Sequence, residues 1–111
     1  MMKKKILFVC TGNRDRSPTA EETYKDHPDL IVKSAGTSAY AYTPIDKQLL
    51  DWADAILVMT PHHKETILRN YPAVKTPIYT LYIEDYYRYM DKDLVEVIIE
   101  RTEPILKEIL K

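Results

Sequence analysis

The architecture of this chain follows from one stretch of sequence, Val9-Cys10-Thr11-Gly12-Asn13-Arg14-Asp15-Arg16-Ser17-Pro18. The apolar run that leads into it, residues 6–9, is typical of a buried strand. After it, Ser17 and Pro18 predict the start of a helix, with serine as the N-cap and proline in the first helical position. A loop that leads from a strand into a helix N-terminus gathers backbone N–H groups at one spot, where they attract an anion.

Cys10 and Arg16 enclose this loop, with five residues between them. Cys10 is the only cysteine of the chain. Converging N–H groups beside a guanidinium favour the thiolate form of a cysteine. The planar fork of Arg16 matches two oxygens of a phosphoryl group. A thiolate beneath a bound phosphoryl group is a nucleophile for phosphoryl transfer, so these residues predict a cysteine-dependent phosphatase.

Residues 10–18, C-T-G-N-R-D-R-S-P, resemble the signature loop of the low-molecular-weight protein tyrosine phosphatases. The resemblance implies that Cys10 forms a phosphocysteine intermediate and that Arg16 clamps the phosphate and stabilises the transition state. The phosphate-binding residues that it implies are Thr11, Gly12, Asn13, Arg14, Asp15 and Arg16. Ser17 is expected to donate a hydrogen bond to the thiolate as well as to cap the helix.

Two residues inside the loop are expected to shape its backbone. Gly12 is expected to let the backbone approach the oxyanion closely. Asn13 is expected to adopt a left-handed conformation, which asparagine tolerates better than most residues. By resemblance to the family, the Asn13 side chain locks the loop through Ser34.

Strands and helices are predicted to alternate along the whole chain. The predicted strands are residues 4–9, 30–34, 55–59 and 77–81, and the predicted helices are residues 17–26, 43–52, 60–70 and 92–110. Pro104 is expected to kink or break the last helix. The pattern predicts a three-layer α/β/α fold with a four-stranded parallel sheet, in the flavodoxin-like topology of the family. Ligands bind at the carboxyl ends of such strands, where Cys10, Thr60 and the acidic loop 82–91 are expected to meet.

Further segments resemble the family's motifs. They are Ser34-Ala35-Gly36-Thr37, the segment 52–59, and Ile83-Glu84-Asp85-Tyr86-Tyr87. The last of these implies that Asp85 is the general acid, whereas alignment on the tyrosine pair would place Glu84 there. Tyr86, Tyr87 and, more weakly, Tyr40 are candidates for the walls of a substrate cleft.

The chain is shorter than typical family members, and the missing length falls between Thr37 and Pro44 and around residues 71–77. In the family, the first of these regions helps to wall the cleft and supplies a histidine near the site. No residue of this chain corresponds to that histidine.

His62-His63 is interpreted as a pair of surface helix histidines, because no cysteine or acidic residue accompanies them at metal-ligand spacing. No metal site and no cofactor are predicted.

Two positions of the loop bear on activity and substrate. Family loops often carry a second cysteine where this chain has Asp15, and we expect that carboxylate to face solvent or Arg14. Threonine at position 11 is typical of the phosphoarginine phosphatase branch of the family.

The leading interpretation of the chain's function is a phosphotyrosine phosphatase, with a phosphoarginine phosphatase or a phosphate-binding module without turnover as alternatives. Arsenate reduction is disfavoured, because it needs further cysteines.

Length, charge and composition limit the number of domains, the kinds of partner and the location of the protein. The chain has 111 residues and a net charge of −1, which fits one phosphatase domain over residues 1–111 and argues against nucleic acid or an anionic membrane as the main partner. No apolar run is long enough to span a membrane. A single cysteine excludes an internal disulfide and fits a cytoplasmic location. A phosphorylated protein or small phosphomonoester is the expected partner, and a monomer is favoured.

Overall fold

A computed structural model describes residues 2–111, in which strands and helices alternate. The elements are β1 (Lys4–Cys10), α1 (Arg16–Tyr24), β2 (Leu30–Gly36), α2 (Lys47–Trp52), β3 (Ala55–Val58), α3 (Pro61–Asn70), β4 (Ile78–Thr80) and α4 (Lys92–Ile109). The strands form one sheet in the order β2-β1-β3-β4, and all neighbouring strands are parallel. The predicted fold class is therefore confirmed.

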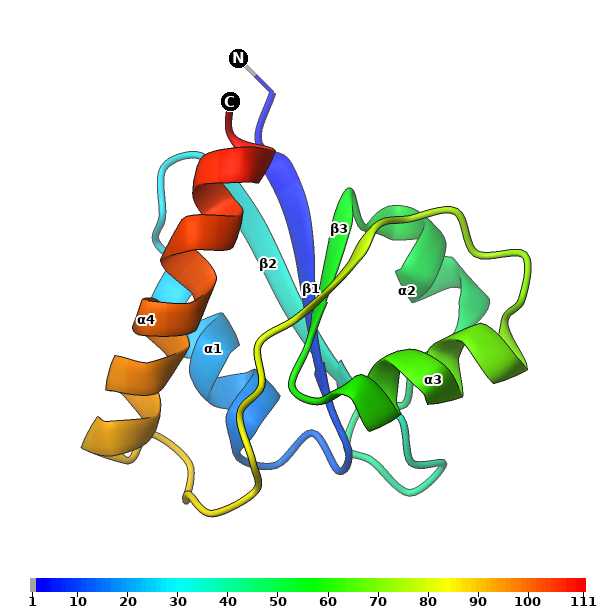
Figure 1. Cartoon of the computed structure of the whole chain (residues 1–111), viewed down its shortest axis with the longest axis horizontal. Coiled ribbons are helices and arrows are strands. Elements are labelled where there is room, and N and C mark those ends of the chain that lie inside the picture. The colour runs from blue at the N-terminus through cyan, green and yellow to red at the C-terminus, as the bar shows by residue number, and fades with distance from the viewer. Residues whose placement is uncertain (1) are drawn as a thin grey trace.

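Strand β1 forms the centre of the molecule because it is covered on both faces. Ile6 and Phe8 belong to the apolar cluster beneath α1 and α4, whereas Leu7 and Val9 belong to the cluster beneath α2 and α3. Figure 1 shows these two pairs of helices on opposite sides of the sheet. A strand buried on both faces needs a continuous apolar sequence, which explains why residues 6–9 have no polar member.

Two helices begin at other residues than predicted. The N-cap of α1 is Asp15 rather than Ser17, because the Ser17 hydroxyl is engaged in hydrogen bonds beside Cys10. Helix α2 begins at Lys47 rather than at residue 43, and the Asp46 side chain accepts a hydrogen bond from the Leu49 backbone N–H at 2.7 Å. Pro44 instead forms a parallel bridge with Gly36. Asp46 is a strong N-cap residue, and this explains the later start.

The sequence predicts a kink or a break at Pro104, and helix α4 continues through this residue without a break. Its buried side chains lie on both sides of the proline and pack against the sheet: Leu94, Ile98, Thr102 and Leu106. Burial of this stripe offsets the hydrogen bond that the proline removes. Among the described residues, no helix has both the length and the apolar character needed to cross a membrane.

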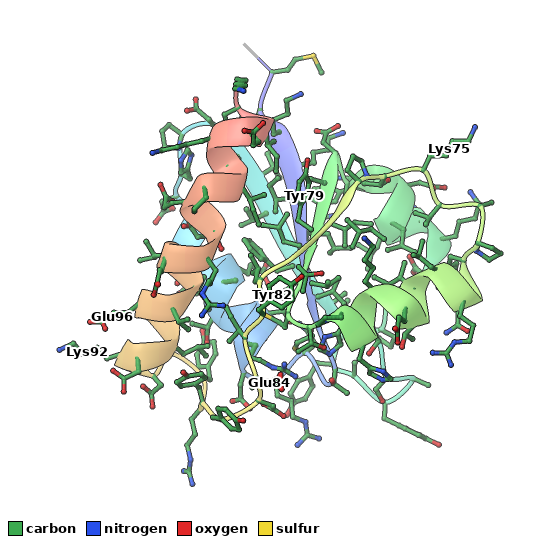
Figure 2. All side chains as sticks on the ribbon, viewed as in Figure 1. Lys75, Tyr79, Tyr82, Glu84, Lys92 and Glu96 are labelled. Carbon is green, nitrogen blue, oxygen red and sulfur yellow. The ribbon has the colours of Figure 1, made fainter. Side chains whose placement is uncertain are left out.

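The carboxyl ends of β1, β3 and β4 lie at one edge of the sheet, opposite the chain termini (Figure 1). The segment between β4 and α4 passes this edge, and Figure 2 labels Tyr82 and Glu84 on it. Arg101 of α4 holds the start of the segment by donating to the Leu81 and Tyr82 carbonyls at 3.1 and 3.0 Å. The predicted meeting of three chain segments at this edge is therefore confirmed.

Candidate active site

Cys10 ends β1 at the floor of a small cavity. Its side chain is nearly covered, with 2% of the residue exposed, and its Sγ lies 3.0 Å from the Ser17 Oγ. The cavity has a volume of about 240 Å³. It is lined by Cys10, Thr11, Gly12, Arg14, Asp15, Arg16 and Asp85. This volume is large enough for a small anion and is too small to enclose a whole phosphorylated side chain with its backbone.

Ser17 links the sulfur to the structure around it. Its hydroxyl accepts a hydrogen bond from the Asn13 Nδ2 at 2.9 Å and lies 3.2 Å from the Ala35 carbonyl, to which it can donate. A hydroxyl has only one proton, so the Cys10 sulfur and the Ala35 carbonyl compete for it. An ionised sulfur is the stronger acceptor and would draw this proton toward itself.

Asn13 has the expected left-handed backbone, with φ of 55°. Its Nδ2 also donates to the Ser34 Oγ at 3.0 Å, so the hydrogen bond predicted between these residues is present. Ser34 in turn donates to Glu21. Hydrogen bonds therefore tie the loop to both β2 and α1.

The loop carbonyls are turned away from the cavity. Those of Cys10 and Thr11 accept hydrogen bonds at 2.9 and 3.0 Å from the backbone N–H groups of residues 37 and 38. Gly36 permits this close approach, because a Cβ there would lie 2.4 Å from the Thr11 carbonyl oxygen. Gly12 has no comparable constraint, since a Cβ there would meet only the Arg14 side chain at 3.6 Å.

Arg16 is buried beside the cavity, with only 4% of the residue exposed. Its Nη1 donates to the Ile83 carbonyl at 2.9 Å. Its Nε lies 3.7 Å from the Asp85 Oδ1, in an ion pair with a carboxylate that is 67% exposed. A buried guanidinium with one partly solvated partner has capacity for a further anion.

The structure distinguishes between the two acidic candidates on the segment before α4. Asp85 lines the cavity and contacts Arg16, whereas Glu84 is exposed and does not line the cavity.

The three tyrosine candidates do not line the cavity. Tyr40 and Tyr86 are exposed, and Tyr87 packs against the apolar cluster beneath α4. Their place in a wider substrate cleft around this small cavity stays a prediction.

His63 is the residue at the site that sequence reasoning missed. The expectation of two surface histidines holds for His62, which is exposed, but is wrong for His63, which is 2% exposed. The His63 Nε2 lies 2.8 Å from the Thr11 Oγ1, in the loop between β1 and α1. The available signal was its position three residues after the helix cap Thr60, where a capping-box side chain turns back toward the cap.

Asp15 neither pairs with Arg14 nor points simply into solvent. The Arg14 guanidinium lies over the Tyr42 ring, with its carbon 5.3 Å from the ring centroid. The Asp15 Oδ1 instead accepts a hydrogen bond from the Tyr89 backbone N–H at 2.8 Å. The adjacent Met90 N–H donates to the Thr19 hydroxyl at 2.9 Å. The segment between β4 and α4, which carries Asp85, is thus attached near its end to the loop between β1 and α1 and to α1 itself.

We expect Asp15→Ala to lower kcat for aryl phosphates by about three- to ten-fold, because it removes the charged acceptor that holds the Asp85 segment. Asp15→Asn keeps an acceptor oxygen in the same place and is expected to remain close to wild type. Steady-state kinetics of the two variants provide the measurement. A sharp rise in the activity of Asp15→Asn would show instead that the carboxylate opposes anion binding in the cavity.

Comparison with protein-family models gives no match. Among curated proteins, the chain is 34% identical to a protein-arginine-phosphatase from Geobacillus stearothermophilus, over 72% of this chain and 70% of the relative. It is 32% identical to a low-molecular-weight protein-tyrosine-phosphatase from Acinetobacter johnsonii, over 73% of this chain and 74% of the relative. Among solved structures, an arginine phosphatase from Geobacillus stearothermophilus superposes with a TM-score of 0.71 and 27% identity, over 96% of each chain.

Proposed function

The chain belongs to the low-molecular-weight protein tyrosine phosphatase family, and we propose on that basis that it hydrolyses phosphorylated protein side chains through a phosphocysteine at Cys10. The observation that carries the proposal is the arrangement at the cavity: one sulfur at its floor, a buried guanidinium beside it, and a carboxylate at its mouth. Few other functions require these three groups around a space that fits a small anion.

In the first step, the phosphoryl group binds in the loop, with its oxygens facing the backbone N–H groups and Arg16. The Cys10 thiolate attacks phosphorus, and a sulfur–phosphorus bond forms while the bond from phosphorus to the leaving atom breaks. Asp85 gives its proton to the leaving atom. Ser17, at 3.0 Å from the sulfur, supports the thiolate before the attack and whenever it is released.

In the second step, water attacks the phosphocysteine. The Asp85 carboxylate takes one proton from this water, the sulfur–phosphorus bond breaks, and inorganic phosphate and the thiolate are released. Arg16 stabilises the charge on the phosphoryl oxygens in both transition states, and its hydrogen bond to the Ile83 carbonyl keeps it in position throughout.

Two substrate classes fit this chemistry. The resemblance of the loop favours phosphotyrosine, whose leaving atom is an aryl oxygen. A specific observation favours phosphoarginine as the second candidate. Thr11 places a hydroxyl at the cavity, and the arginine phosphatase named above is among the relatives of this chain. The leaving atom would then be a guanidinium nitrogen, and the two-step mechanism would be otherwise the same.

The function is tested by presenting the wild-type chain with a phosphotyrosine peptide and a phosphoarginine peptide of the same sequence. We expect phosphate release from at least one of them, and the ratio of the two kcat/KM values assigns the substrate class. Tight binding of phosphate without release from either peptide would identify a binding module and contradict the proposal.

A further inference from the structure

The His63 ring is held on its Nδ1 side by Thr60. The Thr60 backbone N–H donates to the His63 Nδ1 at 3.1 Å, and the Thr60 hydroxyl lies 2.9 Å from the same nitrogen. Because a backbone N–H can only donate, Nδ1 carries a lone pair, and in the neutral ring the proton is on Nε2. Burial, and next the positive charge of Arg16, lowers the pKa of His63 to about 4. Near neutral pH the ring is therefore a fixed Nε2–H donor.

This donor meets the Thr11 hydroxyl. The Thr11 Oγ1 lies 2.8 Å from the His63 Nε2 and 3.5 Å from the Arg16 Nη2. Both nitrogens donate, and a hydroxyl oxygen has two lone pairs and one proton. The two donors occupy the lone pairs, so the Thr11 proton points away from both. Since Thr11 is exposed and lines the cavity, that proton is available to an acceptor bound there.

We propose that His63 is a positioning residue that makes the Thr11 hydroxyl a fixed hydrogen-bond donor for a phosphoryl oxygen bound above Cys10. The identity of the anion rests on the proposed function. Without His63, only the longer contact from the Arg16 Nη2, at 3.5 Å, would orient the Thr11 hydroxyl, and its proton would be directed less often to the cavity. A neutral histidine achieves this orientation without a second positive charge beside Arg16.

A double-mutant cycle tests the proposal through the Kd of inorganic phosphate, measured by calorimetry, and through kcat/KM for an aryl phosphate. Thr11→Val removes the hydroxyl at nearly constant shape, and His63→Leu removes its donor. Each single variant is expected to weaken phosphate binding about ten-fold, as for a hydrogen bond to a charged group. In the Thr11→Val background, His63→Leu is expected to change the Kd by less than about two-fold.

A merely structural role of His63, through the capping of α3, would weaken binding equally in both backgrounds, and this additivity would overturn the proposal. If His63→Leu destabilises α3, His63→Gln separates the loss of the hydrogen-bond donor from the loss of stability. His63→Gln has an amide oxygen that can accept from Thr60 and an amide nitrogen that can donate to Thr11, so it is expected to recover most of the loss. His62→Leu, on the exposed neighbour, is the matched control and is expected to bind phosphate like wild type.

The outcomes for His63 and for the proposed function are separable. If the wild-type chain binds phosphate but releases none from any phosphorylated peptide, the proposed function fails, and the phosphate-binding cycle still decides the role of His63. Failure of His63→Gln to bind better than His63→Leu, at restored thermal stability, would overturn the role of the donor while leaving the phosphatase proposal intact. Absence of any phosphate binding by the wild-type chain would overturn both.

Discussion

Replacing Cys10 with serine is expected to lower kcat for any phosphorylated substrate by more than about a thousand-fold. A hydroxyl is a far weaker nucleophile than a thiolate at neutral pH, and no other cysteine is present to substitute for it. Serine differs from cysteine by one atom and keeps a hydrogen-bonding partner for Ser17, which lies 3.0 Å from the present sulfur. The fold and the loop are therefore expected to survive the change.

The same variant separates binding from chemistry. The N–H groups of the loop and the Arg16 guanidinium are unchanged by Cys10→Ser, so inorganic phosphate is expected to bind with an affinity within about ten-fold of wild type. Phosphate release assays and calorimetry on one preparation provide both values. Turnover that survives in the serine variant would remove Cys10 from the mechanism, and loss of phosphate binding at unchanged thermal stability would mean that the sulfur is needed for binding.

The second large effect is expected for Asp85→Asn, which removes the only cavity-lining carboxylate besides Asp15 among residues 2–111. For substrates with basic leaving groups, kcat is expected to fall by about a hundred- to a thousand-fold, because no group then protonates the leaving atom. For an aryl phosphate whose leaving group departs as a stable anion, the first step is expected to be affected much less. The dependence of the rate on leaving-group basicity is the measurement.

Glu84→Gln is the matched control for Asp85→Asn. Glu84 precedes Asp85 directly and carries the same charge, but it is exposed and does not line the cavity. We expect it to keep near wild-type rates with every leaving group. If Glu84→Gln shows the large loss and Asp85→Asn does not, the alignment on the tyrosine pair is right and the two residues exchange roles.

Most of the fold could be predicted from the sequence because β1 is unambiguous. Its uninterrupted apolar residues require helices on both faces, and the loop that follows fixes the edge at which ligands bind. The helix starts were less accurate for a physical reason. Ser17-Pro18 matches a local capping pattern, but the Ser17 hydroxyl forms hydrogen bonds with partners from β1, β2 and the loop instead. Such tertiary contacts are invisible to local propensity.

The site was predictable to the extent that it lies within one motif. Cys10 and Arg16 lie close in sequence, and the structure places both at the cavity. His63 lies more than fifty residues away from Thr11, and nothing local in His62-His63 shows which ring points inward. That direction depends on where α3 begins and how it packs on the sheet. The anchoring of the Asp85 segment by Asp15 depends likewise on a contact between distant parts of the chain.

If phosphate passes through the Cys10 sulfur, the covalent intermediate can be trapped. Asp85→Asn lacks the base for the second step, so with an aryl phosphate that has a good leaving group the phosphocysteine should accumulate. Rapid acid quenching, digestion and mass spectrometry locate the phosphoryl group. We expect the peptide containing Cys10 to carry one phosphoryl group, and the same peptide from the double variant Cys10→Ser, Asp85→Asn to carry none. Release of the leaving group without any phosphoryl group on Cys10, or with the group on another residue, would contradict transfer through the Cys10 sulfur.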